Sequence, residues 1–167
     1  MAIKLLSTWK YWSEVPLIGK WIFDLLVSLA SPYTGTLSMR VQSLKPGLCK
    51  ATMKEWFLLR NPFRSVHAAA LMNLGEATGG MAVIALCEAQ HKPHRAIVTR
   101  ITVEYIKKAR GLLTAVTDFT ESIDKNANKS IEGEMVVLTA ILDASGELVC
   151  TIEATWTISS STSAKIK

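Results

Sequence analysis

The feature that most constrains the fold is one long apolar stretch in the middle of the chain, RSVHAAALMNLGEATGGMAVIALCE at residues 64–88. Its spacing predicts a helix from Val66 to Cys87 or Glu88, with Ser65 as the N-cap. One carboxylate, Glu76, stands among neighbours that are mostly small or apolar. Burial raises the pKa of such an acid, which is either a reactive group or a structural acid held by hydrogen bonds. The spacing alone does not decide between these two roles.

The same helix carries three glycines within six positions, and each costs about 1 kcal/mol relative to alanine inside a helix. Another helix, a strand or a ligand must therefore approach the helix closely, and close packing is the commoner reason. The segments on both sides show the alternation of strands. The expected strands are 37–42, 49–53, 97–105, 112–120, 135–142 and 148–158. Short turns between strands indicate an antiparallel sheet, so we predict an α+β fold with five or six strands and the long helix on one face.

Three parts of the chain differ in character. Residues 1–33 read as a helical extension in two pieces, broken at Pro16 and Gly19. Its second piece, Lys20 to Ala30, is apolar almost all round and should be buried against another element. A membrane-surface role is less favoured, because the polar face is not strongly basic. Residues 34–158 form the main domain, and residues 159–167 are rich in Ser, Thr and Lys and are expected to be a disordered tail.

Composition narrows the function classes. The net charge of +5 is spread along the chain, unlike the clustered footprint of a nucleic-acid binder. Cys49, Cys87 and Cys150 are odd in number and far apart, so we expect buried free thiols in a reducing compartment and no metal site. The N-terminal segment has neither the uncharged run of a membrane span nor the pattern of a signal peptide. These features predict a cytoplasmic protein.

The start of the long helix offers a second chemical device. Backbone N–H groups around His67, Ala68 and Ala69 have no intrahelical acceptor and lie at the positive end of the helix dipole. They can hold a carbonyl oxygen that becomes negative during a reaction. Glu76 lies nine residues after His67, about 13 Å along the axis, which is too far for both to act on one bond within a subunit. If both groups take part, the site must be formed by two copies in a homodimer.

These residues resemble the hotdog-fold thioesterases, in the branch related to phenylacetyl-CoA thioesterase. That branch has an Asn, a His-Gly-Gly six residues later and an acid nine residues after the His. Asn61, His67 and Glu76 keep this spacing, and residues 101–111 are similar to the strand and turn that follow the helix in the family. The resemblance covers residues 35–158. The chain departs from it at Ala68 and Ala69, where methyl groups replace the two glycines.

The resemblance implies a helix wrapped by an antiparallel sheet, a homodimer with further pairing into a tetramer, and an acyl-CoA bound across the dimer interface. Glu76 would be the general base or nucleophile, and the Ala68 N–H would polarise the thioester carbonyl. Asn61 and His67 would position the acyl group or the attacking water. No metal or redox cofactor is required, since coenzyme A enters only as part of the substrate.

Further residues are candidates for binding the substrate. Some share the helix with Glu76, one lies where relatives carry Ser or Thr, and the basic ones could contact the phosphates of coenzyme A or belong to an ordinary solvated surface. They are Ala69, Asn73, Thr99, Lys107, Lys108 and Arg110. The leading hypothesis is an acyl-CoA thioester hydrolase. The alternative is a hotdog protein that binds acyl-CoA or a fatty acyl group without catalysis.

Overall fold

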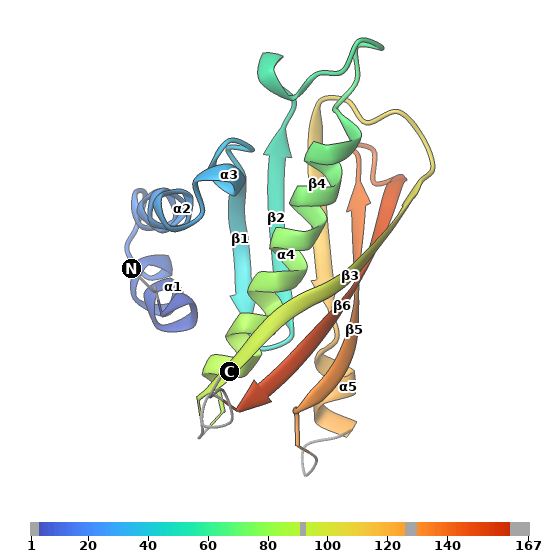
Figure 1. Ribbon diagram of the computed structural model, residues 1–167. Helices are drawn as coiled ribbons and strands as arrows, with labels where there is room; N and C mark the ends of the chain where they lie inside the picture. The colour runs from blue at the N-terminus through green and yellow to red at the C-terminus, as the bar shows by residue number, and fades with distance from the viewer. Residues whose placement is uncertain (1–3, 91–92, 126–129, 161–167) are drawn as a thin grey trace.

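The computed structural model describes residues 4–90, 93–125 and 130–160 (Figure 1). A single antiparallel sheet curls around one long helix, and a pair of helices lies to one side. The helices are α1 (Leu5–Ser13), α2 (Gly19–Ala30), α3 (Pro32–Gly35), η1 (Phe57–Leu59), α4 (Ala68–Glu88) and α5 (Thr120–Lys125). The strands are β1 (Arg40–Lys45), β2 (Leu48–Lys54), β3 (His94–Tyr105), β4 (Leu112–Asp118), β5 (Gly133–Leu142) and β6 (Leu148–Ser160).

The six strands follow the order β1-β2-β4-β5-β6-β3, and every neighbouring pair is antiparallel. Helix α4 crosses one face of this sheet, and the strands curve around it (Figure 1). This is the α+β hotdog arrangement that the sequence predicts, with an additional N-terminal helical segment. Although α4 is long and apolar enough to cross a membrane, 83% of its most apolar window is buried within the fold. It is the core helix of the domain.

The glycines of α4 allow the sheet to approach the helix closely. A Cβ on Gly75 would lie 2.5 Å from the Ile152 side chain, and one on Gly79 would lie 3.1 Å from the Thr139 hydroxyl. That hydroxyl donates a hydrogen bond to the Gly75 carbonyl at 3.2 Å, so the helix backbone is tied directly to β5. Close packing against the sheet, the commoner of the expected reasons, therefore explains these glycines.

Helix α4 begins two residues later than the sequence suggests. The N-cap is His67, whose backbone is extended, and Ser65 is not the cap. Ser65 and Val66 are engaged in the preceding loop, because the Val66 N–H donates to Ala109 and Val66 forms a β-bridge with Arg60. Because these loop contacts hold Ser65 and Val66 out of the helix, the helix begins only beyond them.

The N-terminal segment forms two helices, as expected, with Pro16 in the break and Gly19 as the first residue of α2. Glu88, the last residue of α4, fixes the start of α1. Its two carboxylate oxygens accept hydrogen bonds from the backbone N–H groups of Leu5 and Leu6, each at 2.7 Å. These bonds satisfy two of the unpaired donors at the α1 N-terminus.

Helix α2 packs against the outer edge of β1. The buried Asp24 accepts a hydrogen bond from the Val41 N–H at 3.0 Å, and Lys20 donates to the Gln42 carbonyl at 3.1 Å. Two outward-facing backbone groups of this edge strand are therefore satisfied by a helix instead of another strand. At the opposite edge, the outer side of β3 pairs with no strand among the described residues.

Helix α2 is buried against another element, as expected, but only on one face. Phe23 and Val27 on its inner face are buried, but Trp21, Leu25 and Leu29 on its outer face are 56%, 45% and 69% exposed. The helix has a second apolar face because its sequence is apolar almost throughout, while only one side has a surface to pack on.

Two further predictions from the strand sequences are wrong: alternation places Ile97 and Ile101 on one face of β3, and the apolar run 135–142 predicts a strand covered on both faces. A bulge between Val98 and Arg100 shifts the register of β3, so that Ile97 is 67% exposed instead of sharing the inner face with Ile101. Strand β5 is covered on one face of the chain and not on both, since Val136 and Leu138 are 60% and 59% exposed.

Smaller differences concern element ends. The first strand begins at Arg40, and residues 120–125 form α5 where a strand end and a loop were expected. Ser159 and Ser160 of the predicted tail extend β6, whereas residues 161–167 lie outside the described residues.

Candidate functional site

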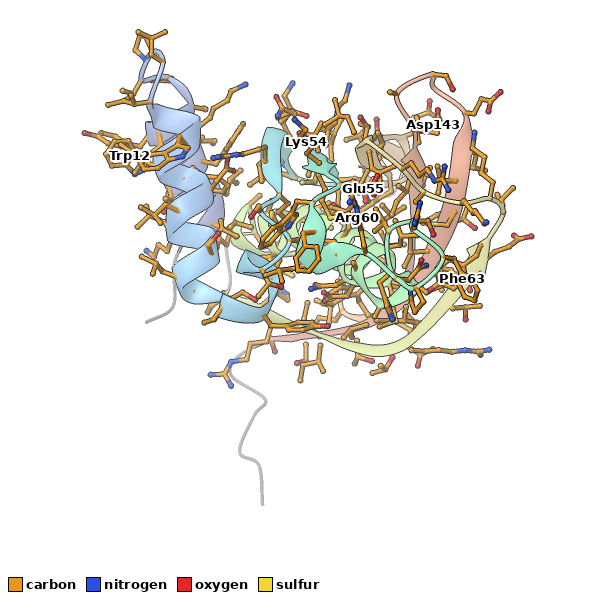
Figure 2. All side chains as sticks on the ribbon, turned by 90° about the horizontal axis from the view of Figure 1, so that it is seen from above. Trp12, Lys54, Glu55, Arg60, Phe63 and Asp143 are labelled. Carbon is orange, nitrogen blue, oxygen red and sulfur yellow. The ribbon has the colours of Figure 1, made fainter. Side chains whose placement is uncertain are left out.

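The loop from Glu55 to His67 covers the N-terminal end of α4 (Figure 2). Glu55 holds this loop in place, because one of its oxygens accepts a hydrogen bond from Arg60 at 2.7 Å and the other accepts from the Gly111 N–H at 2.8 Å. The Arg60 and Gly111 contacts lower the pKa of Glu55, with the Gly111 N–H as the largest cause.

Asn61 closes the tip of this loop. Its side-chain oxygen accepts hydrogen bonds from the backbone N–H groups of Phe63 at 3.0 Å and Ser65 at 3.2 Å. Its amide group lies 3.0 Å from the Ser65 hydroxyl. The side chain predicted to position substrate therefore shapes the loop in this chain, although Asn61 also lines the cavity at the helix start.

His67 uses its side chain to cap its own helix. The Nδ1 atom accepts a hydrogen bond from the Ala69 N–H at 3.1 Å, which in the neutral imidazole leaves the proton on Nε2. The His67 N–H donates to the Leu59 carbonyl at 2.7 Å. Of the three N–H groups predicted as oxyanion donors, only that of Ala68 has no acceptor among the described residues.

Ala68 lines a cavity of about 270 Å³ together with Asn61, Tyr105, Lys107 and Lys108. The Tyr105 hydroxyl donates a hydrogen bond to the Ala68 carbonyl at 3.0 Å and fixes the first peptide unit of α4. Burial, followed by the nearby Cys150, raises the pKa of this phenol, so it remains a donor at neutral pH. The structure thus places the Ala68 N–H beside Lys107 and Lys108, two of the residues predicted to contact phosphate, in one cavity.

The three basic residues predicted to bind phosphate differ in position and in whether their charge is already paired. Lys107 forms ion pairs with Asp143, at 2.6 Å, and with Glu147, so its charge is already balanced. Lys108 is exposed and makes no such pair among the described residues. Arg110 is exposed, lies near Glu55 and does not line the cavity. Of the three, Lys108 is the residue best placed to meet an anionic ligand.

Glu76 lies in a different cavity, of about 330 Å³, between α4 and the N-terminal helices. Burial raises the pKa of its carboxyl group, and no charged partner among the described residues offsets this effect. A Cβ on Gly80 would lie 2.9 Å from the Trp156 ring and 3.7 Å from Glu76 Oε1. Glu76 is therefore a half-buried acid beside an aromatic ring, not an acid tied into a hydrogen-bond network.

The remaining predicted residues lie outside both cavities. Ala69 donates its N–H to His67, as described above. Asn73 is buried one turn before Glu76, and its oxygen accepts a hydrogen bond from the Thr34 hydroxyl at 3.4 Å. Thr99 lies at the β3 bulge and donates to the Thr155 carbonyl at 3.2 Å.

Ala68 and Glu76 cannot meet within one subunit. They are eight residues apart on one helix, about 12 Å along its axis, and their two cavities share no lining residue. The first cavity contains the Ala68 N–H, which has no acceptor among the described residues, and the second contains the Glu76 carboxylate. Among the described residues, no three His, Cys, Asp or Glu side chains lie close enough to hold a metal ion.

The sequence reasoning missed Tyr105 and Trp156 as site residues. Both lie on the inner side of strands in the predicted pattern, where an aromatic residue is usually part of the core. A phenol at the end of a strand is a weak signal for Tyr105, which contacts the start of α4. No comparable signal marks Trp156, which packs against Gly80 in the middle of the helix.

The family model of the domain of unknown function DUF4442 matches residues 19–158. The chain belongs to the DUF4442 family. No curated protein matches this DUF4442 chain significantly.

Solved structures resemble this DUF4442 chain along most of its length. The genomics protein APC5556 superposes with a TM-score of 0.78 at 26% identity, covering 96% of this chain and 100% of that one. Pseudomonas aeruginosa PA5026, described as a probable thioesterase, gives 0.67 at 21% identity, with coverage of 81% and 91%. Escherichia coli PaaI, from the phenylacetic acid degradation operon, gives 0.64 at 14% identity, with coverage of 83% and 91%. At these identities PA5026 and PaaI establish the hotdog fold alone.

Proposed function

We propose that this chain is an acyl-CoA thioester hydrolase that works as a homodimer. The observation that supports the proposal is the pair of groups on α4, an N–H without an acceptor at Ala68 and a desolvated carboxylate at Glu76. Hydrolysis of a thioester needs one group to stabilise the oxyanion and one to activate water. The fold shared with PA5026 and PaaI is consistent with this chemistry.

In the proposed reaction, the thioester carbonyl accepts a hydrogen bond from the Ala68 N–H of one subunit. Glu76 of the other subunit removes a proton from water, and the water oxygen attacks the carbonyl carbon. Alternatively, Glu76 attacks the carbon itself, and water then hydrolyses the anhydride. In both routes the C–S bond breaks, and the coenzyme A thiolate leaves and takes a proton. Lys108 would meet the phosphates of coenzyme A.

The test is hydrolysis of acetyl-, octanoyl-, hexadecanoyl- and phenylacetyl-CoA, followed by reaction of the released thiol. The protein's own thiols should not interfere, because burial raises the pKa of Cys49 to about 12 and those of Cys87 and Cys150 to about 11. Glu76→Gln should abolish turnover while the dimer stays folded. Full turnover by Glu76→Gln would remove this residue from the mechanism.

One observation favours the alternative, an acyl-CoA-binding protein without catalysis. The polar side chains of Asn61 and His67 are committed to the loop and the helix cap, and methyl groups at Ala68 and Ala69 occupy the place of two glycines. Tight binding of octanoyl-CoA without release of thiol from any of the substrates would establish this second function.

A further inference from the structure

The cavity beside Glu76 has a wall that the N-terminal helices supply. Helix α4 forms one side, with Glu76, Gly80 and Ile84 spaced four residues apart along a stripe about 12 Å long. The other side comes from Leu5 of α1, from Val27 and Ala30 of α2, and from Ser31 and Thr34 at α3. The apolar lining consists largely of Leu5, Val27, Ala30, Met81, Ile84 and Trp156. All of these residues belong to a single chain, and we refer to this cavity as the trough.

The charges and hydroxyl groups of the trough indicate what can occupy it. Among the described residues, no lysine or arginine lines it and Glu76 is its single charged side chain, so an anionic ligand would be unfavourable. Its two hydroxyl groups are already occupied. Ser31 donates to Thr34 at 2.9 Å, and Thr34 donates to Asn73. Besides the Glu76 carboxylate, the other unpaired polar side-chain group among the described lining residues is the Trp156 Nε1–H, which is buried within the ring's own packing. The rest of the wall offers apolar contact, which favours a hydrocarbon tail.

The size of the trough further restricts the class of ligand that can bind in it. Its volume of about 330 Å³ is at the lower end of small-molecule pockets, which are roughly 300–1,000 Å³, and is too small for coenzyme A. Its length suits an extended medium-length chain better than a compact aromatic acyl group. Glu76 at its wall would lie beside the carbonyl carbon if the hydrocarbon tail followed the stripe along α4.

We propose that the trough between α4 and the N-terminal helices binds the linear aliphatic tail of the thioester substrate, so that α2 and α3 determine acyl-chain preference. This inference rests on the proposed function for the identity of the head group. It assigns the N-terminal helices, which are additional to the hotdog core, the role of a substrate wall within the subunit.

The measurement is kcat/KM for the full chain with butanoyl-, hexanoyl- and octanoyl-CoA, and with phenylacetyl-CoA. A buried methylene contributes about 0.8 kcal/mol, so kcat/KM should rise about fourfold per added methylene. Phenylacetyl-CoA should be a poorer substrate than octanoyl-CoA. A flat dependence on chain length, or a preference for phenylacetyl-CoA, would overturn the inference.

Two variants alter the trough in opposite directions. Ala30→Phe narrows it at an exposed position of α2 and should remove most of the gain per methylene. Ile84→Ala widens it and should move the optimum toward longer chains. Leu29→Phe is the matched control, because Leu29 is adjacent, 69% exposed and does not line the trough. It should leave the chain-length dependence unchanged, and equal effects of Ala30→Phe and Leu29→Phe would refute the assignment.

A binding experiment separates this inference from the proposed function. Calorimetric titration with the non-hydrolysable thioethers butyl-CoA and octyl-CoA measures the tail contribution without turnover. If no thioester is hydrolysed but octyl-CoA binds more tightly by about fourfold per methylene, and Ala30→Phe removes this gain, the trough assignment stands and the hydrolase proposal fails. Equal affinities for the two thioethers would refute the trough assignment whatever the activity.

Discussion

Ala68→Pro should remove the proposed oxyanion donor while the chain stays folded. Ala68 is the first residue of α4, where proline is well tolerated because the missing N–H has no helical partner. His67 has φ −64° and ψ 139°, the extended geometry that a residue before proline adopts. No hydrogen bond within the described chain is lost. The free energy of unfolding should therefore change by less than about 1 kcal/mol.

The effect on catalysis should be large. Removing one oxyanion donor typically lowers kcat by about 10²–10³, or roughly 2.7–4 kcal/mol of transition-state stabilisation. We expect this loss in kcat with octanoyl-CoA, with little change in KM, because the donor acts chiefly on the transition state. Ala68→Gly is the control, since it keeps the N–H and removes only the methyl group. A folded Ala68→Pro enzyme with nearly full kcat would refute the role of this N–H.

The same variant tests whether the site crosses subunits. Ala68→Pro and Glu76→Gln chains should each be inactive alone, but a mixed dimer has one site with both groups intact. A purified mixed dimer has one of its two sites intact and should show about half of native activity. In an unfractionated sample at equal expression, half of the dimers are mixed, so about a quarter of native activity should return. Co-expression with two affinity tags provides the sample. No recovery in purified mixed dimers would contradict a shared site.

Three further predictions concern the acids. Burial raises the pKa of Glu76 above its ordinary value of 4.5, and a general base must be ionised to act. In a pH profile, kcat/KM should therefore fall as the pH drops through a midpoint above 4.5. A midpoint at or below 4.5 would contradict this role. Asp24→Ala leaves the buried Val41 N–H without its acceptor and should cost about 1–3 kcal/mol in urea unfolding, while Asp24→Asn, which keeps an acceptor oxygen, should cost less. Glu88→Ala should lower the free energy of unfolding by roughly 1 kcal/mol through loss of the α1 cap, and Glu88→Gln by less; equal losses would show that the cap hydrogen bonds contribute little.

The sequence predicted the fold where local pattern and tertiary packing agree. Alternating residues such as Cys49, Ala51 and Met53 gave the hairpin strand, and all three are buried. The pattern failed at the β3 bulge, because one extra residue at Thr99 reverses the face of everything before it. A bulge has no reliable signature in a single strand, since it depends on the pairing with β6.

The site residues were likewise predictable only where spacing along the chain determines the geometry. Spacing alone predicted that Ala68 and Glu76 lie too far apart to act on one bond within a subunit. Their positions in two different cavities confirm this separation. Spacing could not show that Asn61 and His67 use their polar atoms on nearby backbone, because such short-range bonds depend on the loop conformation. Nor could it show that α2 and α3 face Glu76, which is a contact between segments more than forty residues apart.

The two edges of the sheet determine how copies of this chain can associate through strand pairing. Asp24 and Lys20 occupy outward-facing groups of β1, so that edge offers little template for another strand, whereas β3 remains available. A chain with two open edges can add copies indefinitely, as fibrils do. A chain with one open edge stops at two copies, because a two-fold pair uses both available strands. Removal of α2 should therefore expose a second edge of the sheet and make the chain more prone to aggregate.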